Sequence, residues 1–295
     1  MPIVPVYTGR FAPSPSGPLH FGSLIAATSS FLQAKSQQGR WLLRIEDIDS
    51  PRTVPGAADS IMRTLEQFGL FWDGPIIYQS QRLDRYQHVF QQLKQQQLIY
   101  GCDCSRKTIA EQGGIYHGHC AQRNLASGRL AWRLRSKVNP EFNDLVFAKQ
   151  RISTELAAED YIIQRRDGLF SYQLAVVVDD WDQGVTEVIR GADLLEMTPR
   201  QQALFKLLRA PVPNYGHIPV AATAPGVKLS KQNHACNIAR WPTSYTLIKV
   251  LHFLGHTVPA ELNSAPVTEL LSWAIQHWQL ANISRQYEIL QTEFT

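Results

Sequence analysis

The chain has 295 residues, 44% of them hydrophobic, so it can bury a substantial core as one elaborated domain with a small insertion. It contains neither an apolar run of about 20 residues nor a signal-peptide pattern, so we expect a cytoplasmic protein with no membrane partner. A net charge of +4 is compatible with a nucleic-acid partner but does not by itself identify one.

The first hundred residues alternate extended and helical patterns. An apolar stretch at residues 3–11 predicts a strand, and the loop APSPSGPLHFGS leads from it into a helix that Gly39 ends. The segment WLLRIEDID predicts a second strand, and two helices are expected near residues 57–68 and 82–98. This alternation favours an α/β fold with a parallel sheet, in which ligands bind beyond the carboxyl ends of the strands.

The second part of the chain begins with a change in texture. Residues 101–129 are rich in Gly, Cys and His and have little periodicity, which indicates a small insertion held by local cross-links. The segments LAWRLR, FSYQLAVVVDD and TEVIRGADLL read as strands, and a helix is expected from Thr198 to Leu208. A loop with four prolines between residues 211 and 225 follows, and the tail from about residue 241 reads as helical.

The loop after the first strand is the first candidate site. It places Arg10, Gly17, His20 and Gly22 between a strand and a helix N-terminus, where amide groups and the helix dipole favour phosphate. His20 could donate a hydrogen bond to charge that develops during displacement at phosphorus. An ordinary proline-rich loop with a surface histidine explains the composition equally well.

A second candidate lies in VKLSKQN, where Lys228 and Lys231 flank Ser230. Two lysines three residues apart can face one pocket and stabilise departing pyrophosphate. Taken alone, the pattern is also that of an exposed polar loop.

Three cysteines form a third candidate site. Cys102, Cys104 and Cys120 lie within nineteen positions, a spacing suited to tetrahedral Zn²⁺ rather than to a disulfide framework. The fourth ligand could be His117, His119 or Tyr116, and a cluster of free thiols is the alternative.

The first two motifs together resemble a known family. GRFAPSPSGPLHFG is similar to the first signature of glutamyl-tRNA synthetases, and KLSKQ is similar to the Lys-Met-Ser-Lys-Ser signature of class I synthetases. Ser23 stands at the second histidine of the first signature, and Gln232 stands at the final serine of the other. The resemblance covers about residues 8–235. It implies a Rossmann-like class I catalytic domain with a zinc-binding insertion and a short helical C-terminal region.

The same resemblance implies a division of the chain. Residues 1–100 and 161–240 would form the two halves of the catalytic domain, the second half carrying the KLSKQ loop. Residues 101–160 would form the zinc-binding insertion, of the type that approaches a tRNA acceptor end, and residues 241–295 a helical appendage.

Residue roles follow from the resemblance. His20 and Lys231 would be catalytic, and ATP would be bound with Mg²⁺ by these two and by Gly22, Ser23 and Lys228. Arg10 and Arg190 would hold the carboxylates of L-glutamate, Glu46 its ammonium group, and Tyr172 would close the pocket. The implied zinc ligands are Cys102, Cys104, Tyr116 and Cys120, and the full glutamate set is Arg10, Phe11, Ala12, Pro13, Ser14, Glu46, Tyr172 and Arg190.

The length of the tail suggests the acceptor. Only 63 residues follow Gln232, fewer than the anticodon-binding region of glutamyl-tRNA synthetases needs. The chain resembles truncated paralogues that activate glutamate without tRNA and attach it to queuosine at the wobble position of tRNA(Asp). We therefore expect ATP, L-glutamate and queuosine-containing tRNA(Asp) as partners of a monomer. The alternatives are ordinary charging of a tRNA acceptor end, an inactive RNA-binding paralogue and a small-molecule nucleotidyltransferase.

Overall fold

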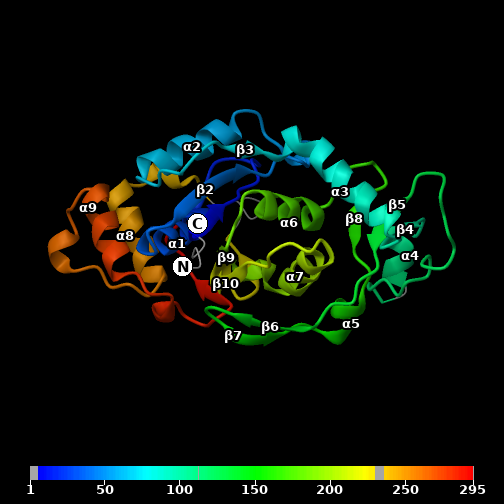
Figure 1. Cartoon of the computed structure of the whole chain (residues 1–295). Helices are drawn as coiled ribbons and strands as arrows, with labels where there is room; N and C mark the ends of the chain where they lie inside the picture. Colours follow the sequence, from blue (N-terminus) through cyan, green and yellow to red (C-terminus); the bar gives the residue numbers. More distant parts are fainter. Residues whose placement is uncertain (1–5, 112, 230–235, 295) are drawn as a thin grey trace, which may run out of the picture.

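The computed structural model describes residues 6–111, 113–229 and 236–294 (Figure 1). Its centre is a parallel sheet in which β1 pairs with β2 and β2 pairs with β3. A second parallel pair, β9 with β10, continues it, since the Thr186 amide donates to the Thr8 carbonyl at 2.9 Å. The strands are β1 (Thr8–Phe11), β2 (Arg40–Ile45), β3 (Ile77–Tyr78), β9 (Glu187–Gly191) and β10 (Asn214–Ile218).

Helices cover this sheet and divide the core in two. One hydrophobic cluster joins β1 and β2 to α1, α2, α8 and α9, and a second cluster joins α3, α6 and α7. Figure 1 places α8 and α9 beside α1 at one end of the molecule and the insertion at the opposite end. The helices are α1 (Phe21–Ser36), α2 (Ala57–Gln67), α3 (Leu83–Gln95), α6 (Tyr172–Asp182), α7 (Thr198–Leu207), α8 (Thr243–Phe253) and α9 (Val267–His277).

The insertion has its own small antiparallel sheet, in which β5 lies between β4 and β8. A hairpin of β6 and β7 returns along the molecule to β10, where the Leu145 amide donates to the Tyr215 carbonyl at 2.9 Å. The elements of this part are β4 (Ile99–Cys102), α4 (Arg106–Glu111), β5 (Ala131–Leu134), β6 (Glu141–Asp144), β7 (Ala148–Arg151), α5 (Thr154–Ala158) and β8 (Ile162–Gln164).

The mixed α/β fold confirms the expected class, but two local predictions were wrong. The segment from Tyr172 is helix α6 and not a strand, because it is buried over eight consecutive positions, 173–180, which hides the helical period. The expected loop at 211–225 contains β10 and then β11 (Val220–Ala224). Pro211 and Pro213 precede β10 and Pro219 lies between the two strands, so these prolines do not interrupt either strand. Part of the predicted first strand, residues 3–5, lies outside the described residues.

The tail contains an element that the sequence reading did not anticipate. After α9, β13 (Glu288–Leu290) pairs in parallel with β11, which also pairs with β12 (Val227–Lys228). Phe294 then stacks on Phe21 at a ring separation of 4.2 Å, and both rings are buried. The end of the described chain therefore packs into the core against α1.

Among the described helices, none has the length and apolar character needed to cross a bilayer.

We expect Phe294→Ala to lower the free energy of unfolding by about 3–5 kcal/mol, because it removes a buried ring from the core. Urea unfolding followed by fluorescence would measure the change. Leu290→Ala is the matched control in the same segment, since that side chain is 59% exposed and its loss should cost less than about 0.5 kcal/mol. Equal effects of the two substitutions would contradict the packing described here.

Candidate active site

The first loop connects β1 to α1 at the carboxyl end of the sheet. His20 is the N-cap of α1, and its Nδ1 accepts a hydrogen bond from the Ser23 amide at 3.3 Å. An acceptor at Nδ1 puts the proton of the neutral ring on Nε2, from which it can be donated. Gly17 has φ of 135°, a backbone conformation that other residues rarely adopt. The loop therefore presents a hydrogen-bond donor beside a helix N-terminus.

The lysine segment lies against this loop. A side chain at Gly22 would come within 3.4 Å of the Leu229 carbonyl oxygen and within 3.1 Å of the His20 ring, so a larger residue would crowd the histidine where the two motifs meet. Lys228 ends β12, and its Nζ forms an ion pair with Asp193 at 2.6 Å. Lys231, with Ser230 and Gln232, lies outside the described residues. The described start of the second signature, at Leu229, thus lies against the first signature, far from it in sequence.

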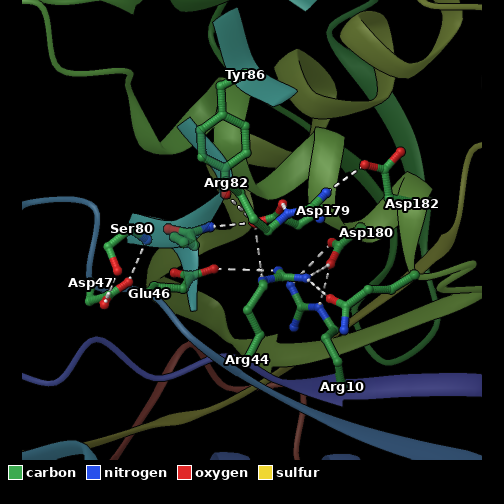
Figure 2. A network of polar contacts seen from close by, with 12 residues as sticks. Arg10, Arg44, Glu46, Asp47, Ser80, Arg82, Tyr86, Asp179, Asp180 and Asp182 are labelled. Carbon is green, nitrogen blue, oxygen red and sulfur yellow. Dashed lines mark hydrogen bonds and ion pairs between the residues drawn. The ribbon is translucent and has the colours of Figure 1, made fainter. Parts of the chain in front are cut away.

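Charged side chains buried at the base of the site form a network of ion pairs and hydrogen bonds (Figure 2). Arg44 on β2 is fully buried, and its Nη1 donates to Asp180 at 2.7 Å. Arg10 on β1 donates from Nε to the same carboxylate at 3.2 Å, and Asp179 lies 3.7 Å from Arg44 Nε. Although burial opposes ionisation, Arg10 and Arg44 together hold the pKa of Asp180 below its usual range. These contacts fix the position of Arg10.

Asp179 extends the network to helix α3 and the turn before it. It accepts hydrogen bonds from Gln79 at 2.8 Å, Arg82 at 2.6 Å and the Tyr86 hydroxyl at 2.8 Å. The sequence reading left Asp179 and Asp180 without a role and did not identify Arg44. Helix α6 brings both aspartates to Arg44, whereas adjacent residues of the expected strand would face opposite sides of a sheet.

Glu46 follows β2, and its neighbours stabilise its ionised carboxylate less than the neighbours of Asp180 stabilise theirs. Its side chain is 8% exposed, and Arg44 Nη2 lies 3.4 Å from its Oε1. Burial raises the pKa of Glu46 to about 7, against the opposing effect of Arg44 and Arg10. The Glu46 amide donates to the Pro13 carbonyl at 3.0 Å, which joins the ends of β1 and β2. A hollow of ≈ 280 Å³ opens there, lined by Ser14, Pro15, Ser16, Glu46, Asp49, Arg52 and Thr53.

The remaining residues expected for glutamate approach the same region from other elements. Tyr172 begins α6; burial raises the pKa of its phenol, and Arg190, Glu46 and Arg10 are the charges that act on it. Arg190 on β9 is 4% exposed. Among the loop residues, Phe11 turns its side chain into the core, where its ring is 6.4 Å from that of Trp41. Only the backbone of Phe11 is therefore available to a ligand, whereas Ser14 is exposed and both Ala12 and Pro13 are half-buried.

The cysteine cluster lies about the insertion sheet, in a separate part of the molecule. The Sγ atoms of Cys102, Cys104 and Cys120 all lie within 4.8 Å of one another, and two of them are 3.5 Å apart. Ligands about 2.3 Å from a tetrahedral ion are about 3.8 Å from each other, so the cluster could hold a metal ion. Tyr116 is buried, and its hydroxyl accepts from the Cys120 amide at 2.8 Å. His117 and His119 are both exposed.

The fold and these two sites define the class of the protein. A family model described as tRNA synthetases class I (E and Q), catalytic domain, matches residues 6–258. The glutamate-tRNA synthetase of Elizabethkingia anophelis has the same fold, with a TM-score of 0.79 over 98% of this chain and 68% of that one, at 21% identity. The chain belongs to the class I tRNA synthetase family of the E and Q type.

Two relatives that are more similar to this chain in sequence have a narrower name than the family. The Glutamyl-Q tRNA(Asp) synthetase of Vibrio vulnificus strain CMCP6 is 51% identical over 96% of this chain and 93% of its own length. The Glutamyl-Q tRNA(Asp) synthetase of Serratia proteamaculans is 52% identical over 98% of this chain and 96% of its own length.

The pKa of Glu46 generates a prediction. If this carboxylate holds the substrate ammonium group, it must be ionised, so kcat/KM for glutamate should rise with pH through about 7. Glu46→Gln should lower kcat/KM at least about tenfold and abolish that rise. Pyrophosphate exchange between pH 5.5 and 8.5 would measure both effects. Glu66→Gln on the exposed face of α2 is the control, and an unchanged profile in Glu46→Gln would exclude this role.

Proposed function

We propose that the chain uses ATP to activate L-glutamate without tRNA and then transfers the glutamyl group to queuosine at the wobble position of tRNA(Asp). The observation that carries this proposal is the near full-length similarity, at about half identity, to the Glutamyl-Q tRNA(Asp) synthetases of other bacteria. The contact of the His20 loop with Leu229, together with the closeness of Arg10 to Glu46, supports the activation step.

Glutamate would bind at the carboxyl ends of β1, β2 and β9. Arg10 uses its Nε and Nη2 edge for Asp180, which leaves Nη1 to donate to a substrate carboxylate. Arg190 would hold the other carboxylate, and Glu46 would accept from the ammonium group. Tyr172, at the start of α6, would close the pocket. Phe11, Ala12, Pro13 and Ser14 would contribute backbone groups and one hydroxyl.

ATP, which carries Mg²⁺ with it, would lie against Gly22, Ser23 and the N-terminus of α1. His20 would donate from Nε2 to a phosphate oxygen as negative charge increases in the transition state. Lys228 and Lys231 would supply the positive charge that stabilises the departing pyrophosphate. His20 and Lys231 are the proposed catalytic residues.

The reaction has two steps. A carboxylate oxygen of glutamate attacks the α-phosphorus, the bond from that phosphorus to the oxygen bridging to the β-phosphate breaks, and pyrophosphate leaves. A hydroxyl oxygen on the cyclopentene ring of queuosine then attacks the activated carbonyl carbon. The bond to the phosphate oxygen breaks, AMP leaves, and the hydroxyl proton passes to solvent, giving an ester. The mixed anhydride is already a strong acyl donor, so the second step requires no protein base.

We further propose that the insertion holds one structural Zn²⁺ through Cys102, Cys104, Cys120 and Tyr116. Burial of Tyr116 beside the thiols, with both nearby histidines exposed, supports tyrosine as the fourth ligand. Burial raises the pKa of this phenol, so a bound dication would be needed to form the phenolate at neutral pH. The ion would be structural, because four protein ligands leave no open position.

The insertion also offers a surface for RNA. Residues 101–140 contain seven Lys and Arg but two Asp and Glu, so the positive charge of the chain is concentrated there. A hollow of ≈ 690 Å³ between this part and α7 is lined in part by Arg135, Lys137 and Lys206. Such groups can neutralise RNA phosphates and position a stem without reading its sequence.

The zinc proposal predicts about one zinc per chain in purified protein, measured by plasma mass spectrometry. Cys104→Ser should lose most of this metal and lower the unfolding temperature, because it removes one of four ligands. Cys236→Ser is the control, since Cys236 lies outside the cluster and should retain the metal. Equal zinc content in the two variants would contradict the site.

The transfer proposal predicts that labelled glutamate, with ATP and Mg²⁺, becomes attached to tRNA(Asp) that contains queuosine and not to tRNA(Asp) without it. Removal of the 3′ CCA end should leave the labelling unchanged, because the ester forms in the anticodon. An acceptor-end synthetase would show the opposite pattern, labelling both forms of tRNA and losing all activity with the CCA end. Absence of glutamate-dependent pyrophosphate exchange would remove activation itself and leave an inactive RNA-binding paralogue.

A further inference from the structure

Arg190 has an unusual set of neighbours for a buried arginine. Its Nε donates to His217 Nε2 at 3.0 Å, and its Nη1 donates to Gln201 Oε1 at 2.7 Å. Its Nη2 donates to Thr198 Oγ1 at 2.9 Å and to the Leu194 carbonyl at 3.2 Å. All four acceptors are neutral, and within the described ranges Arg190 forms no ion pair. The guanidinium also lies over the ring of Tyr215, 5.0 Å from its centroid. It is thus fixed in place without a carboxylate as counter-ion.

The other two buried arginines of the site differ. Arg10 and Arg44 both contact Asp180, at 3.2 and 2.7 Å. A buried cation without a counter-charge is costly, because it has lost its hydration and gained no opposite charge. At Arg190 this cost is offset when an anionic ligand arrives.

His217 keeps a potential counter-ion away from Arg190. The two residues are register partners on β10 and β9, and because His217 Nε2 accepts from Arg190, the imidazole proton lies on Nδ1. Nδ1 donates to Asp144 Oδ2 at 2.6 Å, while Asp144 Oδ1 accepts from the amides of Val146 and Phe147, both at 2.9 Å. The Asp144 carboxylate is therefore held on the far side of the ring.

We propose that Thr198, Gln201 and His217, here called the neutral cage, fix Arg190 without neutralising it and thereby make the site prefer glutamate to glutamine. This inference rests on the proposed function. The carboxylate that reacts with ATP loses its negative charge in the adenylate, whereas the side-chain carboxylate keeps it throughout. A cation that has no counter-ion within the protein suits the second group.

The neutral cage would exclude glutamine for two reasons. A carboxamide brings no charge, so the buried cation of Arg190 would stay without a counter-ion in the complex. In addition, one end of the carboxamide is a donor, which cannot accept from the guanidinium. Unpaired buried groups of this kind give larger discrimination than a difference in size does.

The test is Gln201→Glu, a substitution that keeps the shape of the side chain and places a carboxylate at the 2.7 Å contact with Arg190 Nη1. In pyrophosphate exchange, we expect KM for glutamate to rise at least about tenfold and the ratio of kcat/KM for glutamate over glutamine to fall at least about tenfold. KM for ATP should change less than about twofold. If Gln201 served structure alone, the new ion pair would hold Arg190 at least as firmly, and KM for glutamate would not rise.

Two further variants separate charge from position. Gln202→Glu adds the same charge on the same helix but in the surface hollow beside Lys206, and both constants should stay as in the wild type. Gln201→Met removes one acceptor without adding charge, so KM for glutamate should rise while the glutamate-to-glutamine ratio stays within about threefold. A ratio that collapses equally in Gln201→Met would overturn the charge argument.

The outcomes distinguish this inference from the function on which it rests. If the wild type shows no glutamate-dependent exchange, the proposed function fails first. If the wild type prefers glutamate and Gln201→Glu retains both its KM and its preference, the neutral cage fails alone. Thermal unfolding would verify that Gln201→Glu is folded. Should it not be, Thr198→Asp places a carboxylate at Nη2 instead and must cause the same loss of preference.

Discussion

The geometry of the site depends on the buried ion pairs that Arg44 makes with Asp180 and Asp179. These pairs connect β2 to α6, and through the same carboxylates they reach Arg10 on β1 and Tyr86 on α3. Buried ion pairs contribute little net stability once desolvation is counted, but breaking one leaves a charge that the interior cannot hydrate. The network therefore acts mainly as a positional constraint, and it joins the two hydrophobic clusters beside the residues proposed to bind glutamate.

Around this network, the charged groups of the site have different electrostatic surroundings. Asp180 is stabilised as an anion by two arginines, Glu46 is left near its point of half-ionisation, and Arg190 is surrounded by neutral acceptors. The surroundings of each group depend on its burial together with its nearest neighbours, and neither factor alone accounts for the difference. A dianionic substrate with one ammonium group complements this distribution.

Motif positions could be predicted from the sequence, but several contacts could not. The elements that carry three of the motifs are of the expected type: the His20 loop before α1, strand β9 and the cysteine cluster of the insertion. They could be predicted because glycine, cysteine and capping residues determine the structure of their immediate sequence neighbours. Helix α6 was missed because a helix buried on all sides loses its period and its valines favour a strand. The neutral cage could not be seen either, since Arg190 and His217 are brought together only by the pairing of β9 with β10. The proposed domain boundaries and residue roles stay predictions.

The cap at the start of α1 bears on how this position can vary among related enzymes. His20 receives its hydrogen bond from the main chain at Ser23, so the identity of the side chain there does not set the tautomer of the imidazole. That side chain could be exchanged without moving the imidazole proton on Nε2 that is proposed to face a phosphate. A serine at a position where histidine stands in the related signature therefore leaves the tautomer of His20 unchanged, and any effect of the exchange would come from the side chain itself.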